Sequence, residues 1–175
     1  MKSNCRLLIV DDEPDIRDTL ELILQDHVSN ITLAVSGLDA LEKIEKEEFD
    51  AVLSDVNMPK LNGIELLRTI RKKGIYVPFV FLTGYGDKEK TVEALRLGAF
   101  DILDKPWEQE NLIDVICNAL ELGTDLNELS HAPDKITELF EGDKDNPKPS
   151  VEYLQNLLKT LAAENQTLKK KLQNT

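Results

Sequence analysis

The sequence predicts an α/β fold in which a parallel sheet has helices on both faces. From residue 6 to about residue 122, short apolar runs alternate with stretches of helical apolar spacing, and this alternation is typical of parallel α/β sheets. The runs are mostly continuous in hydrophobicity, as expected for strands buried on both sides. Turn-forming or acidic residues flank each run and indicate where the strands end.

Five strands are predicted from the apolar runs, and helices are predicted in the stretches that follow them. The strands are RLLIV (6–10), ITLAV (31–35), AVLS (51–54), VPFVFL (77–82) and FDIL (100–103). Pro14 suits the first turn of the first helix, and Gly74 and Gly98 suit the ends of the third and fourth. Apolar residues that mainly recur three and four positions apart form the expected buried stripes: Ile16, Leu20, Ile23 and Leu24; Leu38, Leu41 and Ile44; Ile64, Leu67 and Ile70; Val92, Leu95 and Leu97; Leu112, Val115, Ile116 and Leu120.

Length and charge limit the classes of function. A chain of 175 residues suits one domain with an appendage. A formal net charge of −12 argues against a nucleic-acid partner, because phosphate neutralisation needs clustered Lys and Arg. No apolar run approaches the roughly 20 residues that span a bilayer, and the first apolar run lacks the flanks of a secretion signal. We therefore expect no membrane segment.

The two cysteines, Cys5 and Cys117, lie far apart in apolar segments. They have no metal-ligand or redox spacing. We expect both to be buried, reduced core thiols, in keeping with a cytoplasmic location.

The composition changes after Leu122 and divides the chain into three predicted parts. Residues 1–123 form the α/β domain. Residues 124–150 form a linker, in which residues 133–140 have the spacing of a short amphipathic helix and the rest is rich in Gly, Pro and charge. Residues 151–175 carry apolar residues spaced alternately three and four apart, which predicts a coiled-coil helix.

The heptads of residues 151–175 favour a parallel homodimer. With Val151 at position a, leucine occupies every d position and Asn165 occupies one a position, as in parallel two-stranded coils. About three heptads form a marginal helix alone, so pairing is expected to need help from the domain. The alternative is an exposed helix folded back on the domain. The run 169–171, all lysine, is interpreted as a solvated helix end and not as a nucleic-acid contact.

Polar residues follow four of the five predicted strands. In a parallel sheet these positions share the carboxyl edge, where open α/β sheets bind ligands. A single strand-end Asp is more often a helix cap or a turn residue, but capping does not require Asp, Thr and Lys on one edge. The residues are Asp11 and Asp12 after the first strand, Asp55 after the third, Thr83 after the fourth and Lys105 just after the fifth.

This edge predicts a phosphoryl-binding site that contains a divalent cation. Three crowded carboxylates would repel one another unless a cation joined them, and oxygen ligands without His or Cys favour Mg²⁺. Lys105 and Thr83 would complete the pocket as a mobile positive charge and a hydroxyl donor. Taken singly, Lys105-Pro106 is simply a turn, and the Thr83 hydroxyl would bond the turn that follows it.

The same residues carry a family resemblance. LLIVDDEP, AVLSDVNMP, FLTGYG and GAFDILDKP occur in the order and spacing that resemble the receiver domain of two-component response regulators, and they are similar to the chemotaxis response regulator. The match covers residues 5 to about 122. It implies a doubly wound, flavodoxin-like sheet of strand order 2-1-3-4-5 with five helices, and a cis Lys105-Pro106 bond.

The resemblance also implies a role for each site residue. Asp55 would be the phosphoacceptor, and Thr83 and Lys105 would contact the phosphoryl oxygens. An aspartate can act as the nucleophile once a metal offsets the repulsion between two anions. The donor would be the phosphohistidine of a histidine kinase, and the labile product would make the chain a self-resetting phosphoacceptor and not an enzyme. The implied Mg²⁺ ligands are Asp11, Asp12, Asp55 and the backbone carbonyl of Asn57.

One position departs from the family pattern. Ile102 stands three residues before Lys105, where receivers usually have a Tyr or Phe whose ring turns inward on switching. Phe100, Tyr85 or Trp107 are candidates to replace that ring, but an aliphatic side chain that shifts little is the simpler interpretation. Tyr85 also lies two residues beyond the switch threonine, where its bulk would slow attack by water.

The expected function is that of a stand-alone regulator. Phosphorylation of Asp55 would change the face formed by the last two helices and strand, and a coiled-coil dimer would present that face to an unidentified protein partner, without a DNA-binding or enzymatic output domain. The alternatives are a pseudo-receiver scaffold and a receiver cut before an effector domain. A haloacid-dehalogenase-type phosphatase is disfavoured, because it would carry a second Asp where Asn57 stands.

Overall fold

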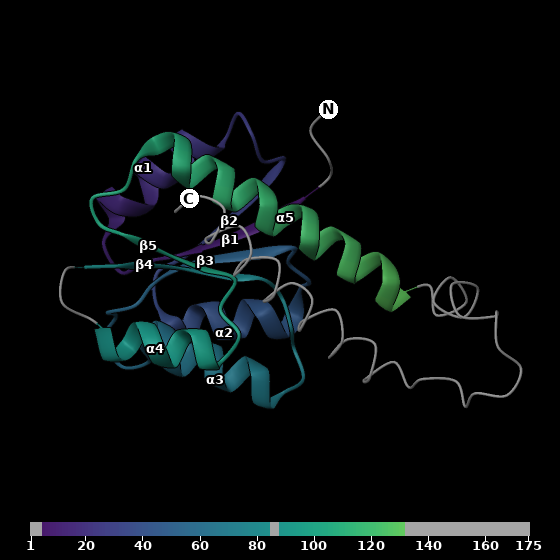
Figure 1. The fold of residues 1–175 in the computed structure, drawn as a ribbon. Helices are drawn as coiled ribbons and strands as arrows, with labels where there is room; N and C mark the ends of the chain where they lie inside the picture. The colour runs from purple at the N-terminus through teal and green to yellow at the C-terminus, as the bar shows by residue number, and fades with distance from the viewer. Residues whose placement is uncertain (1–4, 85–87, 132–175) are drawn as a thin grey trace, which may run out of the picture. The chain divides into compact units, whose positions relative to one another are not determined.

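The computed structural model describes residues 5–84 and 88–131, in which strands and helices alternate (Figure 1). All five predicted strands are confirmed to within two residues of their expected ends. The strands are β1 (Arg6–Val10), β2 (Asn30–Ala34), β3 (Ala51–Asp55), β4 (Phe79–Thr83) and β5 (Asp101–Asp104). The helices are α1 (Pro14–Leu24), α2 (Gly37–Lys46), α3 (Gly63–Lys72), α4 (Lys88–Arg96) and α5 (Gln109–His131).

The strands form one parallel sheet of order β2-β1-β3-β4-β5, as the resemblance implied. Helices α1 and α5 cover one face of the sheet, and α2, α3 and α4 cover the other (Figure 1). The register pairs Asp55 with Leu82 and Thr83 with Asp104. The ends of β3, β4 and β5 therefore meet at one edge of the sheet.

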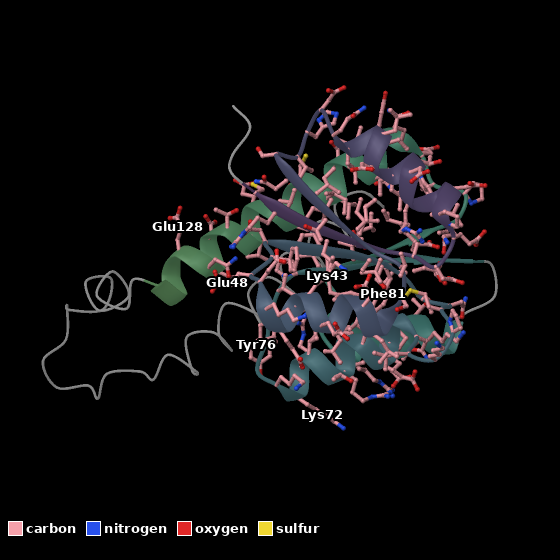
Figure 2. All side chains as sticks on the ribbon, turned by 180° about the vertical axis from the view of Figure 1, so that it is seen from behind. Lys43, Glu48, Lys72, Tyr76, Phe81 and Glu128 are labelled. Carbon is pink, nitrogen blue, oxygen red and sulfur yellow. The ribbon has the colours of Figure 1, made fainter. Side chains whose placement is uncertain are left out.

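Each face of the sheet has its own apolar cluster, because successive residues of a strand point to opposite faces. In β1, Leu8 and Val10 belong to the cluster beneath α2, α3 and α4, while Leu7 and Ile9 belong to the cluster beneath α1 and α5. Figure 2 shows Phe81 in the layer between the sheet and the helices of the first cluster. The continuous apolar runs of the sequence reflect this burial on both sides.

Local sequence explains most of the helix boundaries. Pro14 opens α1, and Asn62 and Glu65 form a reciprocal capping box at the start of α3. Gly74 and Gly98, which follow α3 and α4, both have a φ of 76°, a left-handed conformation that suits glycine after a helix end. None of the helices in the described ranges combines the length and apolarity that a membrane crossing requires.

The predicted buried stripe of α4 is wrong at Val92 and Leu95. Val92 and Leu95 are 48% and 49% exposed, while Ala94 is buried and Leu97 is partly buried against the sheet. Apolar residues of α4 lie on two faces of the helix, with Ala94 on one and Val92 and Leu95 on the other. The prediction chose the face with the larger side chains, and that face is exposed to solvent. Leu38 at the start of α2 was also expected to be buried and is 48% exposed.

The two cysteines differ in burial. Cys5 is buried as predicted, but the prediction for Cys117 is wrong, because this thiol is exposed. Helix α5 turns Ile116 and Leu120 toward the sheet, and Cys117, one residue beyond Ile116, is rotated about 100° away from that face. Partial burial of the thiol and the negative charge of Asp114 raise the pKa of Cys117.

Helix α5 continues past the predicted end near Leu122 and reaches His131. Residues 124–131, expected to begin the linker, are therefore helical, although the first compact unit of the chain does end at Thr124. Gly123 lies inside the helix and does not end it. Its lack of a side chain is explained by close contact between α5 and Asp50, the residue before β3. A Cβ atom on Gly123 would lie 1.6 Å from the Asp50 carbonyl oxygen. The expected helix over 133–140 and coil over 151–175 lie outside the described residues.

Candidate functional site

Three buried polar side chains lie at the carboxyl edge of the sheet. Asp11 directly follows β1, Asp55 ends β3 and Thr83 ends β4. They are only 1%, 6% and 3% exposed, respectively. Because burying polar and charged groups is costly unless they are paired, the partners of these side chains decide what the site can do.

Lys105 joins the two buried carboxylates. Its Nζ atom lies 2.5 Å from Asp55 Oδ1 and 3.3 Å from Asp11 Oδ2. The backbone brings Lys105 to this edge, since its N–H donates to the Thr83 carbonyl at 2.7 Å. The Lys105-Pro106 peptide is cis, as the resemblance implied. The structure thus brings together three of the residues that the sequence placed at one edge.

The second oxygen of Asp55 is held by the loop after β3. The backbone N–H of Asn57 donates to Asp55 Oδ2 at 2.5 Å, and Ser54 Oγ donates to the Asp55 carbonyl at 2.9 Å. Gly63 lets the start of α3 pack beneath this loop, because a Cβ atom there would lie 2.3 Å from the Asp55 carbonyl oxygen. The Asp55 carboxylate therefore has a fixed orientation.

Asp11 is oriented from the start of α1. Its Oδ1 atom accepts from the Glu13 N–H at 2.9 Å, and Arg17 Nη1 donates to the Asp11 carbonyl at 2.6 Å. One carboxylate oxygen thus faces the helix and the other faces Lys105. Asp12, the next residue, is exposed.

The electrostatics of the site favour positive charge. Burial raises the pKa of Asp55 and the Asp11 charge adds to this rise, while Lys105 and the Asn57 N–H oppose it without cancelling it. Burial acts to lower the pKa of Lys105, but hydrogen bonds with Asp55 and Asp11 and their charges outweigh it, so this pKa is raised. Lys105 is therefore firmly protonated, and further positive charge beside Asp55 would be favourable.

The oxygen atoms at this edge fit Mg²⁺ better than a softer metal. In residues 5–84 and 88–131, no group of three or more His, Cys, Asp or Glu side chains is close enough to hold a metal ion. Mg²⁺ usually takes only one or two carboxylates and completes its shell with water and other oxygens. Asp11 and Asp55, which already share one ammonium group, suit that requirement.

The remaining predicted residues are less closely gathered. The Thr83 hydroxyl donates to the Gly84 carbonyl at 3.3 Å, which matches the turn interpretation for this residue. Ile102 packs against the cluster beneath α4, whereas Phe100 and Trp107 pack against the cluster on the opposite face of the sheet. These two rings therefore do not take the place of Ile102, and Tyr85 lies outside the described residues.

Sequence analysis missed Lys90, which donates from α4 to Asn57 Oδ1. No local pattern indicated this contact, because a lysine on an amphipathic helix is usually part of a solvated face. It also missed Arg17 on α1, for the same reason.

Comparison with known families gives one clear match. The family model described as response regulator receiver domain matches residues 7–117. The transcriptional regulatory protein FixJ of Bradyrhizobium diazoefficiens is 37% identical over 123 residues, which are 69% of this chain and 58% of FixJ. The response regulator protein PilR of Pseudomonas aeruginosa is 36% identical over 69% of this chain and 27% of PilR. The chain therefore spans less than two thirds of the length of these relatives.

Solved structures with the same fold are also similar in sequence. The chemotaxis protein CheY4 of Vibrio cholerae has a TM-score of 0.62 and 33% identity, covering 67% of this chain and 99% of CheY4. FixJ-N has a TM-score of 0.64 and 31% identity, covering 68% of this chain and 95% of FixJ-N. Both similarities span nearly the whole of the compared structure but only about two thirds of this chain.

Proposed function

This chain belongs to the response regulator receiver family, and from that premise we propose that Asp55 accepts a phosphoryl group from a histidine kinase with Mg²⁺ as cofactor. The main support is the contact of one ammonium group, that of Lys105, with both Asp55 at 2.5 Å and Asp11 at 3.3 Å in a largely buried site. This arrangement concentrates positive charge where a phosphoryl group would join the carboxylate.

The proposed reaction is a phosphoryl transfer to oxygen. A carboxylate oxygen of Asp55 attacks the phosphorus atom, an O–P bond forms, and the bond from phosphorus to the imidazole nitrogen of the donor breaks. Lys105 remains protonated and neutralises charge on the phosphoryl oxygens. The Thr83 hydroxyl turns from the Gly84 carbonyl to donate to a phosphoryl oxygen. Later attack by water on the phosphorus of the acyl phosphate breaks the bond to Asp55, releases inorganic phosphate and restores the carboxylate.

The proposed cofactor offsets anionic repulsion. When bound, Mg²⁺ would reduce the repulsion between the Asp55 carboxylate and the incoming phosphoryl group. The Asn57 N–H, which donates to Asp55 Oδ2, keeps the acceptor oriented during the transfer. The residues that would hold the ion are Asp11, Asp12, Asp55 and the backbone carbonyl of Asn57.

We further propose that output requires a protein partner and a second copy of the chain. The receiver domain would be residues 1–123, and residues 151–175 would pair as a parallel coil. The heptad spacing supports the pairing of two copies. The strongly acidic net charge of −12 supports a protein partner over a nucleic acid.

Labelling with acetyl phosphate tests the acceptor assignment. Wild-type protein should incorporate one labile phosphoryl group with Mg²⁺ and none after chelation, and Asp55→Asn should fall to background, because an amide cannot form the acyl phosphate. Asp104→Asn is the matched control, since Asp104 is an exposed carboxylate at the same edge and its loss should leave labelling unchanged. Undiminished labelling of Asp55→Asn would remove Asp55 as the acceptor.

A further inference from the structure

Helix α4 is attached to its neighbours largely through polar contacts. Its one fully buried apolar side chain in the described cluster is Ala94, which has little apolar surface to bury. Along the helix, Glu93 forms an ion pair with Arg68 of α3. At its end, the guanidinium of Arg71 donates to the carbonyls of Leu97 and Gly98 at 3.4 and 3.2 Å. Polar partners therefore do much to set the position of α4.

One of these polar contacts leads directly to the proposed phosphoacceptor. Lys90 Nζ, near the start of α4, donates to the side-chain oxygen of Asn57. The backbone N–H of the same Asn57 donates to Asp55 Oδ2 at 2.5 Å. Asn57 thus connects Asp55 to α4. Its backbone N–H contacts the Asp55 carboxylate, and its side chain contacts Lys90 on the helix.

Among the residues that the structure describes, apolar side chains give only a weak connection between Asp55 and α4. Ile102 is the β5 side chain on the α4 face of the sheet, and it is aliphatic and only partly buried. Phe100 and Trp107 pack on the other face. An aliphatic residue has no large ring to turn inward, so the polar connection is the more direct path from Asp55 to α4.

We propose that Lys90 is a positioning residue that couples the phosphorylation state of Asp55 to helix α4 through the side chain of Asn57. The inference rests on the proposed function, because a phosphoryl group on Asp55 is its input. Phosphorylation replaces the single negative charge of the Asp55 carboxylate with a phosphoryl group that carries about 1.5 to 2 negative charges, beside the Asn57 peptide. The added charge changes the field at the Asn57–Lys90 contact and attracts the Lys90 ammonium group, so the start of α4 moves with it.

Backbone amide NMR of the full chain with Mg²⁺ and beryllofluoride, a stable mimic of the phosphoryl group, tests the coupling. In wild-type protein the amide signals of Asn57 and of α4 residues 90–96 should all shift. In Lys90→Met the Asn57 signal should still shift, while the α4 shifts are lost. Lys90→Arg, which keeps a cationic donor, should restore them. Lys46→Met is the matched control, because Lys46 lies on the surface in an exposed ion pair with Glu42 and its loss should leave all shifts intact.

A second variant separates coupling from general damage to the fold. Asn57→Ala keeps the backbone N–H and carbonyl and removes only the side chain that Lys90 contacts. It should lose the α4 shifts as Lys90→Met does, and the double variant should lose no more than either single one.

The outcomes distinguish the two proposals. Full α4 shifts in Lys90→Met, with a normal Asn57 shift, would overturn the coupling and leave the proposed function intact. If wild-type protein shows no Asn57 shift and takes no label from acetyl phosphate, the proposed function fails and the coupling loses its input.

Discussion

Lys105 compensates for the burial of two neighbouring carboxylates. Asp11 and Asp55 are each less than a tenth exposed, and two like charges in a shielded site repel strongly. The ammonium group of Lys105 contacts both. Burial nevertheless keeps the pKa of Asp55 above its ordinary value, so the site remains receptive to a further cation.

Replacing Lys105 with Met should destabilise the protein at neutral pH. We expect the free energy of unfolding at pH 7 to fall by about 1–3 kcal/mol, because two carboxylates lose their shared cation. A raised folded-state pKa means that, as pH falls toward this value, the folded protein binds protons before the unfolded chain does. Lys105 lowers the folded-state pKa of Asp55, so this pKa is higher still in the variant, and the penalty shrinks as pH falls through it. Urea unfolding in a series from pH 7 downward should show the loss shrinking.

Lys46→Met provides the control for this experiment. Lys46 and its partner Glu42 are exposed, and such pairs contribute about 0–1 kcal/mol. A Lys105→Met loss that grows on acidification, or that is no larger than the control loss, would contradict the paired-carboxylate interpretation.

At the scale of single elements, α5 shows how one contact can override a local signal. Glycine disfavours the interior of a helix by about 1 kcal/mol relative to alanine, and it is common just after a helix end. Gly123 nevertheless lies within α5, where the backbone of the residue before β3 comes too close for any side chain. The close approach of helix and sheet therefore explains this glycine.

The Gly123→Ala variant separates these two effects by the sign of its result. Helix propensity alone predicts a gain of about 1 kcal/mol, whereas the clash with the Asp50 carbonyl predicts a loss of about 1–3 kcal/mol. We expect the loss, measured by urea unfolding. Asn118→Ala, at an exposed position of the same helix, should be neutral or slightly stabilising. A more stable Gly123→Ala variant would contradict the close contact.

At the scale of the whole molecule, the described part of the chain contains all of the proposed acceptor site. Asp11, Asp55 and Lys105 come from three separate strand ends, and they belong to the compact unit formed by residues 1–124. The proposed pairing segment, residues 151–175, lies outside the described residues. Its role as a parallel coil stays a prediction from heptad spacing.

Light scattering on the full chain and on residues 1–131, which end with α5, tests the pairing. The full chain should be dimeric and the shorter chain monomeric or much weaker in pairing, with or without beryllofluoride. Leu161→Lys in the full chain should also disrupt the dimer, because it places like charges in the seam. If residues 1–131 pair as tightly as the whole chain, the heptad prediction is wrong.

The strands and the sheet edge could be predicted from sequence because their signals are local. Continuous apolar runs mark strands that are buried on both faces, and a parallel sheet places the residues after such runs at one edge. The strand ends therefore predict that Asp11, Asp55 and Lys105 lie together, as they do in the structure. The strand order and the cis peptide came from family resemblance and not from spacing.

Only the tertiary structure decided which face each helix buries and which side chains meet across elements. Ala94 faces the sheet in place of Val92 and Leu95, and Cys117 faces solvent. When a helix carries many apolar residues, their spacing alone does not show which face is buried. The contact of Lys90 with Asn57 joins residues 33 positions apart. Such contacts depend on how helices pack on the sheet, and packing is settled by the fit of many distant side chains at once.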